Sequence, residues 1–135
     1  MKSKQNGATL IEVLVALLLL SIGLLGVAGL QINALQVNRG AHVRSQASVL
    51  AYYIADRMRA NRDAALDGDY DVLFGEDPSG ATIDRLDLAN WKAELASTLP
   101  AGDGEVSLIA GNIVVIRVRW TDKTFTETFE TRTEI

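Results

Sequence analysis

Few side chains in this chain have the types and spacings that catalysis requires. The single histidine, His42, lies between Arg39 and Arg44, where an imidazole is more often a surface residue than a base. Serine and aspartate occur, but a nucleophilic triad needs a histidine placed to accept the serine proton. No glycine-rich loop followed by lysine, the pattern that binds nucleotide phosphates, is present. We therefore predict that the protein is not an enzyme and uses no cofactor.

Three alternating aspartates, Asp67, Asp69 and Asp71, invite the hypothesis of a calcium loop. The EF-hand pattern requires a glycine next and a glutamate at its twelfth position. Val72 and Pro78 occupy these positions, so that pattern fails. An irregular calcium loop and a solvated acidic loop both remain open, and the solvated loop is favoured. The absence of cysteine excludes thiolate metal sites, and we predict no metal site.

One acidic residue lies inside a long apolar segment near the amino terminus. The residues from Ala8 to Leu30 carry a single charge, Glu12, and as a helix they are long enough to cross the ~30 Å hydrocarbon core of a bilayer. A carboxylate in such a segment costs roughly 3 kcal/mol on insertion scales. Glu12 therefore requires a partner or a role.

Three interpretations of this segment compete. A secretory signal peptide would use Gly26 and Ala28 as the small residues before its cleavage site, but the apolar run is longer than a usual signal core and contains Glu12. A plain single-span anchor leaves Glu12 unexplained. In the third interpretation a short leader ends at Gly7. Glu12 then lies roughly 6 Å along the helix from Ala8, near the lipid head groups, where the α-amine of a neighbouring subunit can neutralise it.

The segment resembles the amino-terminal signal of type IV prepilins and pseudopilins. The resemblance rests on the run Gly7-Ala8-Thr9-Leu10-Ile11-Glu12-Val13-Leu14-Val15-Ala16-Leu17, with a glycine before the cleavage site and a glutamate at the fifth mature position. It implies a leader over residues 1–7 that a prepilin peptidase removes, methylation of the new amino terminus at Ala8, and a role for Glu12 in subunit register. The family usually has Phe where this chain has Ala8, so the implied product is N-methylalanine.

The resemblance extends to the PilV-like minor pilins, or type IV pilus modification proteins. The Glu12–Leu17 run, the cysteine-free head and the late stretch Val118–Asp122 carry it. It implies a filament or tip subunit that takes part in pilus assembly. Its implied partners are other minor pilins, the major pilin, the prepilin peptidase and the inner-membrane assembly platform. Two alternatives remain: a minor pseudopilin of a type II secretion system, and a periplasmic binding module with a signal peptide.

The charged residues also predict the orientation of the chain in the membrane and one class of partner that it does not bind. Two lysines, Lys2 and Lys4, immediately precede the apolar segment and favour a cytoplasmic amino terminus, as the family also implies. We expect residues 8–30 to span the bacterial inner membrane and to form filament core later, and residues 31–135 to form a periplasmic head. With 13 basic and 17 acidic residues and no clustered basic face, the chain is not expected to bind nucleic acid.

Hydrophobic periodicity predicts the elements that position these residues. A helical stripe made of Val43, Ala47, Leu50, Ile54 and Met58 continues the apolar segment, so we predict one helix from about Thr9 to about Ala65. An acidic loop follows over residues 67–81. A second helix is predicted with Asp87 as its cap and with Leu88, Trp91, Leu95 and Leu99 on one face. Pro100 and Gly102 end it.

The last third alternates as strands do. We predict strands over Glu105–Ile109, Val114–Trp120 and Thr124–Thr131, joined by turns at Gly111-Asn112 and at Thr121-Asp122-Lys123. Arg117 and Arg119 should pair across strands with Glu127 or Glu130 on a solvated face. The predicted fold class is α+β and pilin-like: a long amino-terminal helix, its first half transmembrane, packed on a small antiparallel carboxyl-terminal sheet.

Overall fold

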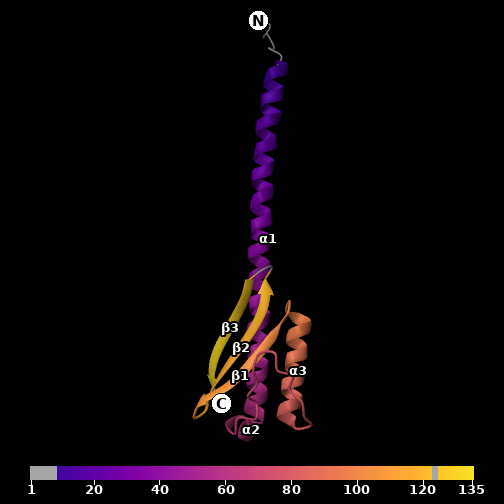
Figure 1. Cartoon of the computed structure of the whole chain (residues 1–135). Coiled ribbons are helices and arrows are strands. Elements are labelled where there is room, and N and C mark those ends of the chain that lie inside the picture. Colours follow the sequence, from indigo (N-terminus) through magenta and orange to yellow (C-terminus); the bar gives the residue numbers. More distant parts are fainter. Residues whose placement is uncertain (1–8, 123–124) are drawn as a thin grey trace. The chain divides into compact units, whose positions relative to one another are not determined.

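The computed structural model describes residues 9–122 and 125–135. Its elements in chain order are helices α1 (Leu10–Ala60), α2 (Arg62–Leu66) and α3 (Ile83–Thr98), followed by strands β1 (Asp103–Ala110), β2 (Ile113–Asp122) and β3 (Phe125–Glu134). Figure 1 labels all six elements. The predicted α+β class is confirmed, with a long apolar helix and a three-stranded antiparallel sheet.

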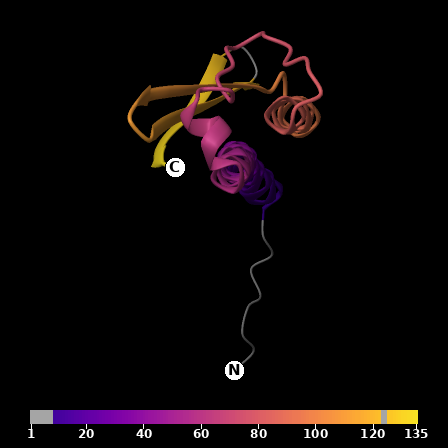
Figure 2. The same cartoon turned by 90° about the horizontal axis from the view of Figure 1, so that it is seen from below.

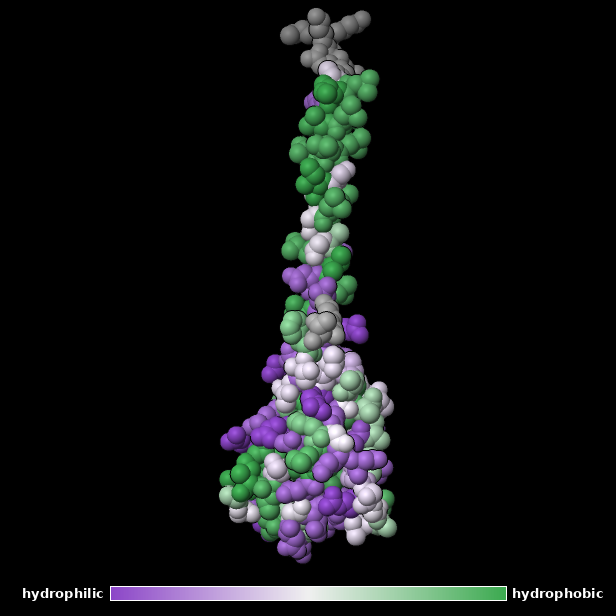
Figure 3. Space-filling view, in the orientation of Figure 1, coloured by the Kyte–Doolittle hydropathy of each residue, from purple (hydrophilic) through white to green (hydrophobic). Residues whose placement is uncertain are grey.

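The chain divides into two compact units, one ending at Arg39 and the other beginning at Gly40. In the first unit every described residue is exposed, and most of them are apolar. Figure 3 shows apolar side chains on most of the visible face of the amino-terminal part of α1, whereas polar side chains predominate on the second unit. The second unit, residues 40–135, is called the head below.

The head is built around the buried face of α1 between Ala47 and Met58, which covers about three helical turns. Alanines at positions 47, 51 and 55 recur every fourth residue and are fully buried, so the helix backbone can approach its neighbours closely. Ile54 and Met58 extend the same face into a core shared with α3 and the sheet. Figure 2 shows α1 against one face of the sheet, with α3 next to the sheet. The predicted core stripe on α1 is confirmed.

The prediction that one helix continues to about Ala65 is wrong. The helix breaks at Asn61, whose φ of −122° and ψ of 57° lie outside the helical region. The side chain of Asn61 donates to the hydroxyl of Tyr70 at 3.3 Å, and the chain resumes as the five-residue α2. Neither glycine nor proline marks this position, and the contact with Tyr70 accompanies the break.

The predicted start of the second helix is also wrong. Helix α3 begins at Ile83 with Thr82 preceding it, so Asp87 lies inside the helix rather than at its cap. The Asp87 carboxylate accepts a hydrogen bond from the Tyr70 hydroxyl at 2.8 Å and lies 3.6 Å from Arg57. Polar contacts with other elements therefore account for Asp87. The predicted end is confirmed, because α3 stops at Thr98, just before Pro100.

The predicted antiparallel meander is confirmed in the order β1-β2-β3. Val114, Ile116, Val118 and Trp120 are buried on the face toward the helices. Gly111, in the β1–β2 turn, has a φ of +61°, a left-handed conformation that glycine adopts without strain. The turn predicted at Thr121-Asp122-Lys123 is corrected in part. Thr121 and Asp122 belong to β2 and pair with Thr126 and Phe125, and Lys123 lies outside the described residues.

Charged side chains on the outer face of the sheet pair across the strands. Arg117 donates to Glu130 at 2.7 Å and also to Glu105, so the predicted pairing of Arg117 is confirmed. Hydrogen bonds to Glu130 and Glu105 raise the pKa of Arg117 above its ordinary value. Arg119 instead donates to Asp103 at 3.1 Å, and its guanidinium lies 4.2 Å from the centre of the Phe74 ring.

Asp103 fixes the acidic loop to the sheet. Its carboxylate accepts hydrogen bonds from the backbone of Gly75 at 2.7 Å and of Gly104 at 2.8 Å, and it lies 3.2 Å from the Lys92 ammonium. Lys92 also donates to the carbonyls of Leu73 at 2.8 Å and Glu76 at 2.6 Å. Burial opposes ionisation of Asp103, but the hydrogen bonds from Gly75, Gly104 and Lys92 outweigh it and lower its pKa below 3.8.

Asp103→Asn is expected to destabilise the head by about 1–3 kcal/mol at neutral pH, the usual range for lost hydrogen bonds to a charged group. A lowered folded-state pKa stabilises the fold above the unfolded-state pKa. This contribution disappears as pH falls through the folded-state value, below 3.8. The difference between wild type and variant should therefore shrink in strong acid. Tryptophan fluorescence during urea unfolding of the full chain in detergent measures it.

Glu127→Gln is the matched control, because Glu127 is exposed and no described residue pairs with its carboxylate. The control should unfold like wild type at every pH. An equal loss of stability in both variants would contradict the role assigned to Asp103.

Candidate processing and assembly segment

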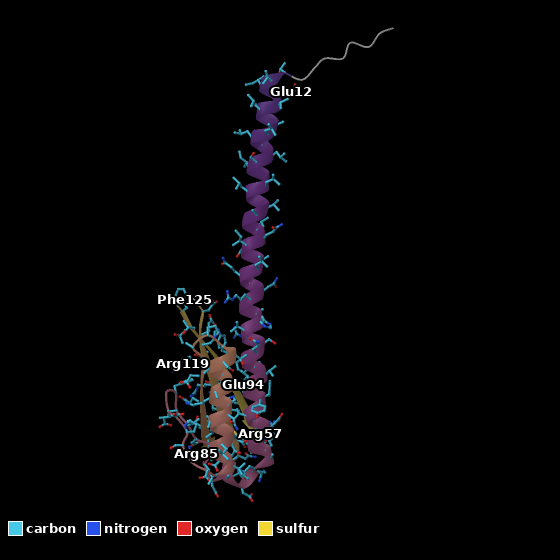
Figure 4. The ribbon with its side chains drawn as sticks, turned by 90° about the vertical axis from the view of Figure 1, so that its right-hand side faces the viewer. Glu12, Arg57, Arg85, Glu94, Arg119 and Phe125 are labelled. Carbon is cyan, nitrogen blue, oxygen red and sulfur yellow. The ribbon has the colours of Figure 1, made fainter. Side chains whose placement is uncertain are left out.

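Glu12 lies in the first turn of α1, where the backbone amides of Glu12 and Val13 donate to the Thr9 carbonyl at 3.0 and 3.2 Å. A carboxylate in a first helical turn interacts favourably with the positive end of the helix dipole. Its side chain is exposed, and among the residues described none forms an ion pair with it. Figure 4 shows Glu12 at the beginning of the helix. The carboxylate is therefore accessible to a partner from another molecule.

The predicted cleavage and methylation positions, Gly7 and Ala8, lie outside the described residues. The described chain begins at Thr9, which immediately follows Ala8 in the sequence. Cleavage after Gly7, methylation of Ala8 and the register role of Glu12 therefore stay predictions.

The segment after Glu12 has the properties of a membrane span. Helix α1 is the one described helix long and apolar enough to cross a membrane, with a mean hydropathy of 2.7 over its most apolar window and no part of that window buried. The Ser21 hydroxyl donates to the Leu17 carbonyl at 2.7 Å, so this polar side chain is satisfied within the helix. Length and composition thus fit insertion in a bilayer, with Glu12 near one end.

The other candidate residues from the sequence are His42 and the aspartates of the acidic loop. His42 is exposed on α1, and no ion pair to it is found in residues 9–122 or 125–135. Asp71 turns toward the sheet, where its carboxylate accepts from the Leu108 amide at 2.8 Å. Within those same residues no three histidine or acidic side chains converge on a point that could hold a metal ion. The calcium-loop hypothesis therefore gains no support.

Sequence reasoning missed the polar contacts that join the loop to the helices. Tyr70 is fully buried, and burial is the main cause that raises its pKa to about 12. Its hydroxyl connects Asn61 to Asp87, and so the end of α1 to α3. The sequence signal for these contacts is Tyr70 itself, because a large aromatic ring favours burial and a buried tyrosine hydroxyl usually needs a hydrogen-bond partner.

Comparison with known proteins locates the same segment. A family model described as the prokaryotic N-terminal methylation motif matches residues 2–28. No curated protein and no solved structure matches the chain. The matched residues contain Gly7, Ala8 and Glu12 and most of the apolar half of α1.

The family-model match and the apolar helix α1 both imply the same class of protein. A prepilin-type methylation motif is characteristic of structural subunits rather than enzymes, and it implies processing by a prepilin peptidase and contact with assembly machinery. An apolar amino-terminal helix fits an inner-membrane anchor. The amino-terminal methylation motif, the long helix and the small antiparallel sheet together support a type IV pilin-like protein.

Proposed function

We propose that the protein is a minor pilin of the PilV-like group, a subunit that takes part in the assembly of type IV pili. The observation that carries the proposal is the methylation motif at the start of the exposed apolar segment of α1, in which Glu12 is the one carboxylate among residues 9–39. A helix that is apolar on all sides must be covered by lipid or by other helices. It can therefore serve first as a membrane anchor and then as filament core.

The proposal assigns roles to the leader, to Gly7 and Ala8 at the cleavage site, and to Glu12. The leader, residues 1–7, holds the precursor with its amino terminus in the cytoplasm and its head in the periplasm. Prepilin peptidase cuts after Gly7 and the new α-amine of Ala8 is methylated. In the filament, Glu12 of one subunit pairs with that amine on its neighbour and so fixes the register. Other minor pilins, the major pilin and the inner-membrane platform are the partners.

Deletion of the gene tests the proposal. We expect fewer surface pili and reduced twitching motility, both restored by the wild-type gene, with unchanged levels of proteins released by type II secretion. Electron microscopy counts the pili, and gel analysis of culture supernatants measures secretion. Loss of secreted proteins with normal pili would favour the alternative, a minor pseudopilin of a type II secretion system.

Gly7→Trp is expected to abolish processing, because a peptidase that requires a small residue before the cut cannot accommodate an indole ring. The variant should keep its seven leader residues, whereas wild type should begin at N-methylated Ala8. Mass spectrometry of the amino-terminal peptide distinguishes the two. Ala8→Ser, which changes the other side of the bond to a residue of similar size, should still be cleaved. A wild-type start near Gly29 would instead indicate a signal peptide.

A further inference from the structure

Helix α3 exposes aliphatic side chains that the fold of the head does not use. Leu88, Trp91 and Leu95 face the core and are fully buried. On the opposite side, exposed residues recur at alternating spacings of three and four. We call this set the α3 outer stripe, and it consists of Ile83, Leu86, Asn90 and Ala93. Ile83 is 67% exposed and Leu86 is 50% exposed.

This spacing is informative because it is the seam pattern of helices that pack against other helices. Single exposed aliphatic residues are normal on protein surfaces. Here, however, two large aliphatic residues and an alanine lie in one row, interrupted by a single asparagine. One asparagine in an otherwise apolar seam is a known means of specifying the register of paired helices. The α3 outer stripe therefore fits a second helix that offers a polar group at the matching position.

The same head exposes a matching stripe on α1. It runs along the side of α1 opposite to Leu50 and Ile54, and we call it the α1 outer stripe: Ala41, Ser45, Val49 and Tyr52. Val49 is 64% exposed and Tyr52 is 52% exposed. This stripe also has one polar member in its middle, Ser45. At 1.5 Å per residue, each stripe is about 15 Å long.

The two stripes match when they are paired antiparallel. In Figure 1, α1 and α3 of one head run in opposite directions, so subunits anchored in the same orientation present α3 antiparallel to a neighbour's α1. Such pairing can place Leu86 opposite Val49 and Ile83 opposite Tyr52.

The same register pairs the polar members of the two stripes. Asn90 lies four residues after Leu86, and Ser45 lies four residues before Val49. When Leu86 faces Val49, Asn90 therefore faces Ser45, and the amide and the hydroxyl can exchange a hydrogen bond. A shift by one helical turn would place each polar side chain against an apolar one. The register also brings Glu94 close to Arg44.

Both of these charged side chains are available for such a contact. Glu94, which Figure 4 labels on α3, is exposed and follows Ala93 of the α3 outer stripe, and Arg44 is exposed and precedes Ser45 of the α1 outer stripe. Neither makes an ion pair with any residue that the structure describes. More widely, residues 13–55 contain no acidic residue, whereas residues 56–135 contain sixteen acidic and nine basic residues. The α1 outer stripe of one copy is thus electrostatically suited to the acidic residues 56–135 of another.

We propose that the α3 outer stripe docks antiparallel on the α1 outer stripe of a second copy of this chain, with Asn90 facing Ser45 and Glu94 close to Arg44. The inference rests on the proposed function only in that both copies share one membrane orientation. It identifies a lateral contact between heads, separate from the contact of the apolar amino-terminal helices.

Cysteine crosslinking tests this contact cleanly, because the chain has no cysteine of its own. Two differently tagged full-length chains, one with Leu86→Cys and one with Val49→Cys, are co-expressed and oxidised in membranes. We expect about fivefold or more heterodimer than from Leu86→Cys with Ser45→Cys, since only facing side chains come within disulfide reach. Equal yields from the two pairs, or more from the Leu86–Ser45 pair, would overturn the antiparallel register.

A third pair controls for the reactivity of the Ser45 position. Asn90→Cys with Ser45→Cys should crosslink about as well as Leu86→Cys with Val49→Cys, because both pairs face each other in the proposed register. A low yield from Leu86→Cys with Ser45→Cys then reflects distance rather than poor access. Background crosslinking from the Asn90–Ser45 pair would contradict the register.

Two further experiments, a non-facing cysteine pair and a charge reversal, separate a specific contact from chance collision. Val49→Cys paired with Ile109→Cys, an exposed position in β1, should give only background crosslinking. Charge reversal by Glu94→Arg should lower the Leu86–Val49 yield by about two- to fivefold, and Arg44→Glu in the other chain should restore it. A yield insensitive to both reversals would contradict the Glu94–Arg44 pairing, and background-level crosslinking throughout would reject the docking surface.

The crosslinking result is independent of the pilus phenotype. Loss of pili on deletion without Leu86–Val49 crosslinking would retain the proposed function and reject the head contact. Crosslinking with normal pili on deletion would retain the contact and reject the proposed function.

Discussion

Glu12→Ala is expected to leave a processed, membrane-inserted subunit that no longer supports pilus assembly. Removing the carboxylate takes nothing from the fold of the head, because Glu12 is exposed at the far end of α1 from the residues that pack in the core. The substitution also lowers the free-energy cost of inserting the helix in the membrane, because it removes a charge. The defect should therefore appear only at assembly, when the α-amine of Ala8 on a neighbouring subunit loses its partner.

The size of this effect follows from the environment of the pair. Breaking a buried ion pair by removing one partner typically costs about 3–5 kcal/mol, and each 1.4 kcal/mol is a tenfold change in an equilibrium. We expect pilus numbers to fall by about tenfold or more relative to wild type. Electron microscopy of pili, with immunoblots of membrane fractions to confirm equal subunit levels, measures the change.

Two variants control this experiment. Glu12→Gln keeps the shape and removes the charge, so it should assemble as poorly as Glu12→Ala. Ser21→Ala alters another polar residue of the span whose hydroxyl is satisfied within the helix, and it should assemble normally. Normal pilus numbers in Glu12→Ala would refute the register role, whereas normal numbers in Glu12→Gln alone would show that shape rather than charge is recognised.

Trp91→Ala is expected to cause the largest loss of head stability, about 3–5 kcal/mol. The indole is completely buried among α1, α3 and the sheet, and its Nε1 donates to the Leu50 carbonyl at 2.9 Å. Its removal leaves a cavity and also breaks the direct hydrogen bond between α1 and α3. Because small domains are stable by only roughly 5–15 kcal/mol, the head should unfold partly at physiological temperature.

Gly104 gives an independent test of the same packing. A Cβ at this position would overlap with the six-membered ring of Trp91 and lie 2.7 Å from Leu95 Cδ1. Gly104→Ala should therefore destabilise the head by about 1–3 kcal/mol through overpacking. Trp91→Phe removes the part of the ring that Cβ would strike, so the double variant should lose less than the sum of the single losses.

Gly40→Ala is the matched control for Gly104→Ala. Apart from its chain neighbours and the adjacent backbone of α1, no atom lies within 4 Å of a Cβ built at Gly40, so the change should be neutral or slightly stabilising. Thermal and urea unfolding of the full chain in detergent, followed by tryptophan fluorescence, provide the comparison. Equal effects of the two alanine substitutions, or strict additivity of the Trp91 and Gly104 changes, would contradict the close contact.

The sequence by itself determined the elements with strong local signals. The apolar run after Glu12 has the length and composition of a membrane helix, and alternation in residues 113–122 specifies a strand, because both patterns depend on near neighbours along the chain. The methylation motif was also predicted from residue types at fixed spacings along the chain, and the family model that matches residues 2–28 agrees with this prediction. The core positions of Ala47, Ile54 and Trp91 followed from the same periodicity.

Only the tertiary structure decided the features that depend on contacts between distant residues. The helix break at Asn61 and the position of Asp87 within α3 coincide with hydrogen bonds to Tyr70, a contact between residues that are distant in the sequence. Likewise, Lys92 and Asp103 are eleven positions apart in the sequence, and the fold brings them together around the loop at Gly75. Helix α3 also carries Ile83 and Leu86 on the side away from the core, and only the tertiary structure shows that both side chains remain exposed.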